Sequence, residues 1–230
     1  MAMKPNIVLV HGAWGDGSHW RHVIPLLYGQ GFKVLAVQSP LTSLADDIDR
    51  TSKLAAGQDG PTLLVGHSYG GAVITGAGHV PNVVGLVYIA AFAPDEGDSL
   101  SSIFARREQP SGARSIRSDK YGFLWIAQES FRESFGQDLD EKEALVMAVS
   151  QKPIAGRCFE DKSGAPAWKS KPSWYQVSAN DRMIPPETEA WMAERIKPKK
   201  TMTLEASHAS MASHPGDVAA LIAEAAGLFV

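Results

Sequence analysis

The segment Gly66-His67-Ser68-Tyr69-Gly70 matches the pattern G-x-S-x-G. In that pattern the serine lies on a sharp, strained turn between a strand and a helix, and the glycines let neighbouring backbone approach closely. The context fits, because the apolar run Leu63-Leu64-Val65 precedes the motif and the small residues Gly70-Gly71-Ala72 follow it. The motif therefore predicts that Ser68 is a nucleophile that attacks a carbonyl carbon.

A serine hydroxyl needs a base that takes its proton, and the base needs an acid that orients it. Proteins with this motif carry the three residues in the chain order serine, aspartate or glutamate, histidine. Asp181 follows an apolar run at 174–177, and His208 follows one at 201–204. We expect His208 to be the base and Asp181 the acid, with all three groups at the carboxyl ends of strands.

Other residues could take these two roles. Asp95 follows another apolar run and is an alternative acid. His214 is an alternative base, but the proline and glycine after it are typical of the start of a helix. His11 precedes Ser68, which is the wrong order for the base. We expect His11 instead to shape the loop that follows it.

The oxyanion that forms when a carbonyl carbon is attacked needs N–H donors. One donor is expected from the residue after the nucleophile, Tyr69. The other is expected from the loop after the first apolar run, His11-Gly12-Ala13-Trp14-Gly15, where Ala13 or Trp14 could turn its N–H inward. We favour Ala13.

Six short apolar runs are separated by segments with helical spacing. Runs with little alternation between apolar and polar residues are typical of strands buried on both faces of a parallel sheet. Strands that alternate with helices predict crossover connections and helices on both faces. The sequence thus predicts an α/β fold with a six-stranded, mostly parallel sheet. The expected strands are 7–10, 32–37, 62–65, 83–90, 174–177 and 201–204.

This alternation stops between residues 95 and 170. The stretch is more polar, carries no convincing buried strand, and has helical spacing at 141–150. We interpret 95–170 as a helical cap inserted over one edge of the sheet, with 1–94 and 171–230 forming the core.

Aromatic residues gather in the expected cap. We expect Phe123 and Trp125, together with Trp14 of the first loop, to form an apolar wall of the binding site. The cap aromatics could equally form a small core of their own.

The 230 residues are 44% hydrophobic and 20% charged, with a formal net charge of −3. This balance fits one globular domain and offers no basic stripe for nucleic acid or an anionic membrane. Cys158 is the single cysteine, so no intramolecular disulfide forms, and we expect it to be a small buried hydrophobic residue. No apolar run reaches the length of a signal segment or a membrane span, and we expect a cytoplasmic location. The oligomeric state stays open, with a homodimer as one possibility.

Four segments carry a resemblance to a known group of proteins: His11-Gly12-Ala13-Trp14, Gly66-His67-Ser68-Tyr69-Gly70-Gly71, Asn180-Asp181-Arg182 and Ser207-His208. They resemble the small α/β-hydrolase-fold serine esterases of the plant methylesterase and hydroxynitrile lyase group, together with related bacterial esterase-like hydrolases. The resemblance covers 4–93 and 172–229. It implies the α/β-hydrolase fold and hydrolysis of a small-molecule ester without a cofactor or a metal, and it supports Ala13 as an N–H donor.

Two positions separate this chain from the lyases of that group, which carry threonine in place of Gly12 and lysine in place of Ala209. Epoxide hydrolases and dehalogenases of the same fold carry aspartate where Ser68 stands. The sequence therefore favours cleavage of a small carboxylic ester through an acyl-enzyme intermediate. The same three residues acting on a lactone, an amide or a carbon–carbon bond are one alternative, and a non-catalytic small-molecule receptor is another.

Overall fold

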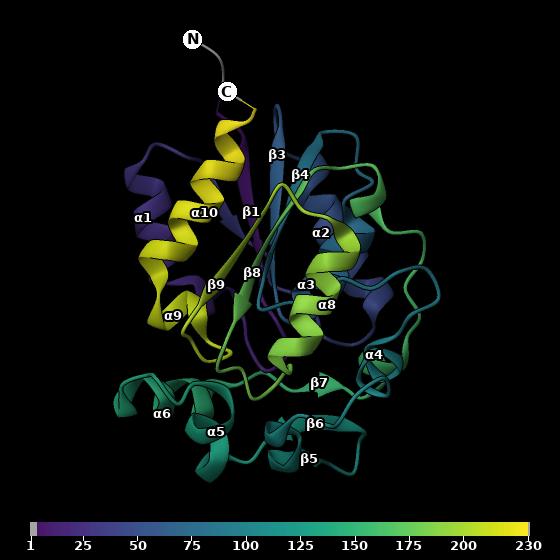
Figure 1. The fold of residues 1–230 in the computed structure, drawn as a ribbon, viewed down its shortest axis with the longest axis vertical. Coiled ribbons are helices and arrows are strands. Elements are labelled where there is room, and N and C mark those ends of the chain that lie inside the picture. Colours follow the sequence, from purple (N-terminus) through teal and green to yellow (C-terminus); the bar gives the residue numbers. More distant parts are fainter. Residues whose placement is uncertain (1–3, 230) are drawn as a thin grey trace.

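The computed structural model describes residues 4–229 and contains a six-stranded sheet in which neighbouring strands run parallel. The strand order is β2-β1-β3-β4-β8-β9 (Figure 1). The strands are β1 (Asn6–Val10), β2 (Val34–Ala36), β3 (Thr62–His67), β4 (Val83–Ile89), β8 (Ser173–Ser178) and β9 (Lys200–Leu204). Each predicted strand is present, so the predicted six-stranded parallel sheet is confirmed.

Helices cover both faces of this sheet, which explains why its central strands lack alternation. Every residue of β1, β3 and β8 is buried, whereas the edge strands β2 and β9 are half-buried or exposed. One face is covered by α1 (Val23–Gly29) and α10 (Pro215–Gly227), and the other by α2 (Leu44–Ala56), α3 (Tyr69–Ala77) and α8 (Pro186–Ile196) (Figure 1). Two short elements, η1 (Gly17–Trp20) and α9 (Ser210–Ser213), contact each other.

The register of the sheet brings the carboxyl ends of the strands to one level. Val10 pairs with Gly66, His67 with Ile89, and Ser178 with Leu204. The loops after these strands therefore emerge at the same edge, which is where ligand crevices of open α/β sheets lie.

The chain between β4 and β8 forms a cap across this edge (Figure 1). Its helical elements are α4 (Leu100–Phe104), η2 (Ser111–Ser115), α5 (Gln128–Phe135), α6 (Glu141–Ser150), α7 (Arg157–Glu160) and η3 (Ala167–Lys169). It also contains an antiparallel sheet of β5 (Ile116–Ser118), β6 (Phe123–Ile126) and β7 (Ile154–Ala155). The prediction of a helical cap missed these strands, because each is short and most of their residues are only half-buried or exposed. The division into a core and a separate cap domain stays a prediction.

None of the helices between residues 4 and 229 combines the length and the apolar character that crossing a membrane requires.

Candidate active site

Ser68 lies on a strained turn between β3 and α3. Its φ of 54° and ψ of −123° place it in a region that residues with a side chain rarely adopt. The flanking glycines make this turn possible. A Cβ at Gly66 would lie 2.5 Å from the carbonyl oxygen of Gly70, and a Cβ at Gly70 would lie 2.5 Å from that of Val10. Only glycine fits at both positions, as the G-x-S-x-G motif predicts.

His208 lies between Ser68 and Asp181 in one chain of hydrogen bonds. Its Nε2 is 2.8 Å from Ser68 Oγ, and its Nδ1 is 2.5 Å from Asp181 Oδ2. The side chains of His208 and Asp181 are fully buried. Because an ionised carboxylate only accepts hydrogen bonds, Nδ1 carries the proton and Nε2 is free to accept one from Ser68. The structure thus brings the three predicted residues together in an order that allows proton transfer from serine to histidine.

The loop after β8 fixes the orientation of the Asp181 carboxylate. Its Oδ1 accepts hydrogen bonds from the N–H groups of Met183 at 2.6 Å and Ile184 at 2.8 Å. These bonds turn Oδ2 toward His208. The loop therefore presents one oxygen to the histidine and holds the other in place.

The alternative residues are engaged elsewhere. Asp95 accepts a hydrogen bond from Lys169 Nζ at 2.5 Å, and this contact lowers the pKa of the Asp95 carboxyl. His214 Nδ1 lies 2.9 Å from Ser213 Oγ. His11 shapes the loop that follows it, as predicted, since its Nδ1 donates to the Gly12 carbonyl at 2.8 Å.

The two residues expected to supply N–H donors, Ala13 and Tyr69, lie beside Ser68 in the structure. Ala13 and Tyr69 line one cavity with Ser68, and within residues 4–229 neither backbone N–H donates a hydrogen bond. The loop after β1 approaches Ser68 so closely that a Cβ at Gly12 would lie 2.7 Å from Ser68 Cβ. Unengaged N–H groups beside a nucleophile can stabilise an oxyanion.

The side chain of Tyr69 is held by a hydrogen bond to the buried carboxyl group of Asp47. The Tyr69 hydroxyl donates to Asp47 Oδ2 at 2.6 Å, and Asp47 Oδ1 accepts from the Leu41 N–H at 2.9 Å. Asp47 is fully buried, and burial raises the pKa of its carboxyl. The first bond holds Tyr69, the first residue of α3 and an expected N–H donor, against helix α2, and the second bond orients the Asp47 carboxyl.

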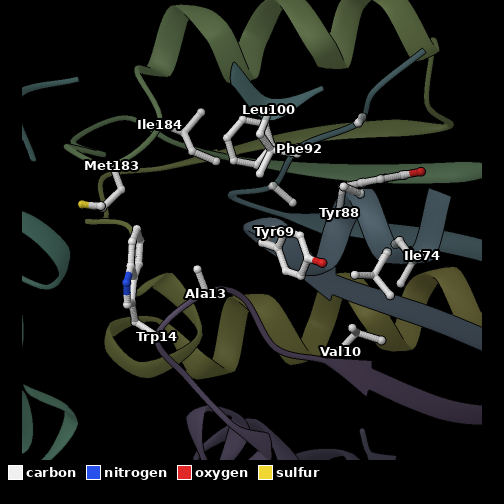
Figure 2. Packing of buried hydrophobic residues seen from close by; sticks show 14 of the residues in the cluster. Val10, Ala13, Trp14, Tyr69, Ile74, Tyr88, Phe92, Leu100, Met183 and Ile184 are labelled. Atoms are coloured by element: carbon white, nitrogen blue, oxygen red, sulfur yellow. The ribbon is translucent and has the colours of Figure 1, made fainter. Parts of the chain in front are cut away.

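A cavity of about 460 Å³ lies beside Ser68 between the core and the cap. Figure 2 shows Trp14, Met183 and Ile184 gathered at one end of the apolar cluster, away from Tyr88 and Ile74. The larger apolar side chains that line the cavity are Trp14, Phe92, Phe104, Ile116, Leu124, Phe159, Met183 and Ile184. Among residues 4–229, no group of three or more histidine, cysteine, aspartate or glutamate side chains is placed to hold a metal ion.

Phe123 and Trp125 do not line this cavity, in contrast to the prediction, whereas Trp14 does. Side chains of a strand alternate between its two faces, and β6 turns Leu124 toward the cavity. Trp125 Nε1 instead donates to Asp119 at 3.3 Å, and Trp14 Nε1 donates to the Leu124 carbonyl at 3.0 Å. The phase of this strand could not be predicted, because the strand itself was missed.

Sequence reasoning also missed several lining residues. Phe92 follows β4, and Met183 follows Asp181 within the same loop. Their positions just past the carboxyl ends of strands are a signal that could have identified them. Phe159 lies in the cap helix α7 and carries no such signal.

Three further histidines, His11, His19 and His67, are buried in the protein. His67 donates from Nε2 to the His208 carbonyl at 2.8 Å, and the two rings lie 4.7 Å apart. Burial lowers the pKa of His11 to about 4 and that of His19 to about 3, and it holds the pKa of His67 well below its usual value. These histidines are therefore neutral in the folded protein at pH 7.

The buried histidines are expected to make the fold sensitive to acid. Below about pH 6.5 the unfolded chain protonates them, whereas the folded chain does so only near the lowered pKa values. Stability is thus unaffected by these groups above pH 6.5 and falls between pH 6.5 and 4. At pH 5 each fully neutral histidine contributes roughly 2 kcal/mol to this loss.

Urea unfolding at pH 7 and pH 5 measures this effect. His19→Gln is expected to reduce the pH dependence, and replacement of the exposed His79 by glutamine should leave it unchanged. Equal free energies of unfolding at the two pH values would contradict the expectation.

Comparison with known proteins gives consistent matches. Residues 7–221 match the model of the Alpha/beta hydrolase family. The carbendazim hydrolyzing esterase of Nocardioides sp. is 35% identical over 119 residues, a match that spans 46% of this chain and 49% of the esterase. Methylesterase 3 of Arabidopsis thaliana is 26% identical over 259 residues, covering 98% of this chain and 97% of that protein.

Two solved structures have the same fold. A pyrethroid hydrolase from Sphingobium faniae matches with a TM-score of 0.85 and 23% identity, over 97% of each chain. Polyneuridine aldehyde esterase matches with a TM-score of 0.84 and 19% identity, over 97% of this chain and 99% of that one. At these identities the two structural matches show a shared fold and nothing beyond it.

Proposed function

The chain belongs to the alpha/beta hydrolase family, and from this premise we propose that it is a carboxylester hydrolase that works through Ser68, His208 and Asp181. The observation that carries the proposal is the hydrogen-bonded chain from Ser68 Oγ through both ring nitrogens of His208 to Asp181. Ser68, at one end of this chain, lines an apolar cavity together with Ala13 and Tyr69, whose N–H groups are unengaged. The names of the relatives, esterase and methylesterase, support an ester as the substrate.

The proposed reaction proceeds in two steps. Ser68 Oγ attacks the ester carbonyl carbon while His208 Nε2 takes the serine proton, and Asp181 stabilises the imidazolium that forms. The N–H groups of Ala13 and Tyr69 stabilise the oxyanion. His208 then gives its proton to the leaving alcohol, which leaves an acyl-enzyme on Ser68.

In the second step water attacks the acyl carbon. His208 accepts a proton from the water, and the oxyanion forms again beside the same two N–H groups. Collapse of this intermediate breaks the bond to Ser68 Oγ, which regains its proton from His208, and releases the carboxylic acid.

The environment of Ser68 supports hydrolysis over lyase chemistry. The lyases that the sequence resembles carry threonine at the position of Gly12, where a Cβ would lie 2.7 Å from Ser68 Cβ. They carry lysine at the position of Ala209, which is fully buried here. Ala209, the residue directly after His208, cannot carry a positive charge that would stabilise a departing anion.

The cavity favours neutral esters. Among its lining residues within 4–229, the only charged side chain is Glu160, whose Oε1 accepts a hydrogen bond from Ser101 Oγ at 2.5 Å. An anionic group on the substrate would enter an apolar cavity without a cation to pair with. We therefore propose that the substrate is a small neutral ester with an apolar acyl or alcohol group. As a separate proposal, the protein is cytoplasmic.

A matched pair of aryl esters tests this proposal. We expect kcat/KM for p-nitrophenyl butyrate to exceed that for the singly charged p-nitrophenyl glutarate by about tenfold or more, because the carboxylate loses its hydration without a partner. Glu160→Gln should reduce the difference in kcat/KM between the two esters. Turnover of neither ester would contradict the proposed function, and equal turnover of both would contradict the proposed substrate class.

A further inference from the structure

Glu189 is a fully buried carboxyl on α8, the helix that begins shortly after the Asp181 loop. Its Oε2 accepts a hydrogen bond at 3.0 Å from the N–H of Ser178, the last residue of β8. Its Oε1 has no partner that could donate to it. Among the ion pairs of residues 4–229, none involves Glu189.

Ser178 lies between the two acidic residues: its N–H donates to Glu189, its carbonyl accepts from the Asp181 N–H at 3.2 Å, and the carboxyl of Asp181 is near enough to raise the pKa of Glu189. Two neighbouring carboxylates in a buried site strongly disfavour double ionisation, so one of them holds a proton. Asp181 accepts hydrogen bonds from two N–H groups and from His208 Nδ1, whereas Glu189 accepts from one N–H group. The negative charge is therefore better stabilised on Asp181, and the proton belongs on Glu189.

The surroundings of Glu189 agree with a neutral acid. Burial is the main cause that raises the pKa of Glu189 well above its usual range, and the charge of Asp181 raises it further. Tyr175 is a titratable group that faces both carboxyls, and its hydroxyl donates to the Ala91 carbonyl. Burial raises the pKa of Tyr175 as well, so it contributes no charge.

We propose that Glu189 is a positioning residue for the reaction: its protonated Oε1 donates a hydrogen bond to Asp181 and so keeps the Asp181 carboxylate ionised and oriented toward His208. The hydrogen-bonded chain then has four members, Glu189, Asp181, His208 and Ser68. This role rests on the proposed function, because it acts on catalysis through Asp181. It also explains how an otherwise unpaired Oε1 is satisfied in a buried site.

Two substitutions separate this role from mere packing. Glutamine keeps an oxygen for the Ser178 N–H and an NH₂ group that can donate to Asp181. Methionine has a similar shape but provides neither. We expect Glu189→Gln to keep kcat within about threefold of wild type, and Glu189→Met to lower kcat by at least about tenfold with little change in KM, since Glu189 does not line the cavity. Glu187→Met, on the exposed side of the same helix, is the matched control and should keep wild-type kcat.

The pH dependence of kcat/KM provides a readout that packing alone would not change. If Glu189 is neutral in wild type, Glu189→Gln removes no charge, and the pH at half-maximal kcat/KM on the acid side stays the same. If Glu189 is ionised, the loss of a negative charge near His208 shifts that pH downward by about one unit. Such a shift, or wild-type kcat in a folded Glu189→Met variant, would overturn the proposal.

Infrared spectroscopy tests the proton on Glu189 without any assay of activity. The difference spectrum of wild type minus Glu189→Gln at pH 7.5 should contain the C=O stretch of a protonated carboxylic acid. A carboxylate band in its place would overturn the proposal, even if Glu189→Met does not fold. Because this measurement needs no substrate, it remains decisive if the protein is found not to hydrolyse esters.

Discussion

Replacing Ser68 by alanine is expected to lower kcat for hydrolysis of a neutral aryl ester by on the order of 10⁴ to 10⁶. Without Oγ no acyl-enzyme can form, and the two N–H groups beside it can only stabilise direct attack by water. His208→Ala should cause a loss of similar size, because Oγ then keeps its proton. Steady-state rates of the purified variants, measured with p-nitrophenyl butyrate, give both values.

The double variant is the sharper part of this experiment. Residues that act as one unit are strongly non-additive, so removing Ser68 and His208 together should cost little more than either change alone. His214→Ala is the control, since the His214 side chain forms a hydrogen bond with the Ser213 hydroxyl and none with Ser68, His208 or Asp181. Wild-type activity in His208→Ala together with loss in His214→Ala would show that the base is misassigned.

The residues of this hydrogen-bonded chain could be predicted because each one has a local signal in the sequence. Ser68 is marked by the glycines that its turn requires, at positions where a Cβ would meet backbone at 2.5 Å. Asp181 and His208 each follow a strand that is recognisable as an apolar run. The sheet register then brings the carboxyl ends of these strands together. The one rule needed to predict this is that the carboxyl ends of parallel strands lie at the same edge of the sheet.

The sheet could be predicted for a similar reason, and the details of the cap could not. Strands buried on both faces leave continuous apolar runs, whereas β5, β6 and β7 are short and partly exposed. Without β6 its phase was unknown, so Phe123 and Trp125 were expected at the cavity wall that Leu124 forms. Comparison with known proteins confirms the predicted fold and the esterase-type family.

Glu189 and His67 show a different limit. A glutamate in an amphipathic helix is usually exposed, and nothing in its spacing indicates that Glu189 is buried against Asp181. His67 stands inside the motif, but its bond to the His208 carbonyl joins residues that lie 141 positions apart. Polar residues that support a site from behind depend on tertiary packing, and so they become visible only in the structure.

Asp181→Asn is expected to lower kcat by roughly 10⁴ while the protein stays folded. The reason lies in the two hydrogen bonds that Asp181 Oδ1 accepts from Met183 and Ile184. They hold the amide oxygen of the asparagine in that position and turn its NH₂ group toward His208 Nδ1. Nδ1 must then accept a hydrogen bond, which moves the ring proton to Nε2, and Nε2 can no longer take a proton from Ser68.

Asp95→Asn is the matched control for this prediction. Asp95 is bonded to Lys169 on the surface, so its replacement should leave kcat within about twofold of wild type, since a surface ion pair contributes little. The circular dichroism spectrum and the thermal midpoint of both variants should match those of wild type closely. Such a match would show that the loss of activity comes from the changed tautomer of His208 and not from unfolding. A normal rate in Asp181→Asn together with a large loss in Asp95→Asn would move the acid to Asp95. A normal rate in both variants would mean that His208 needs no carboxylate, and the proposed mechanism would then have to be abandoned.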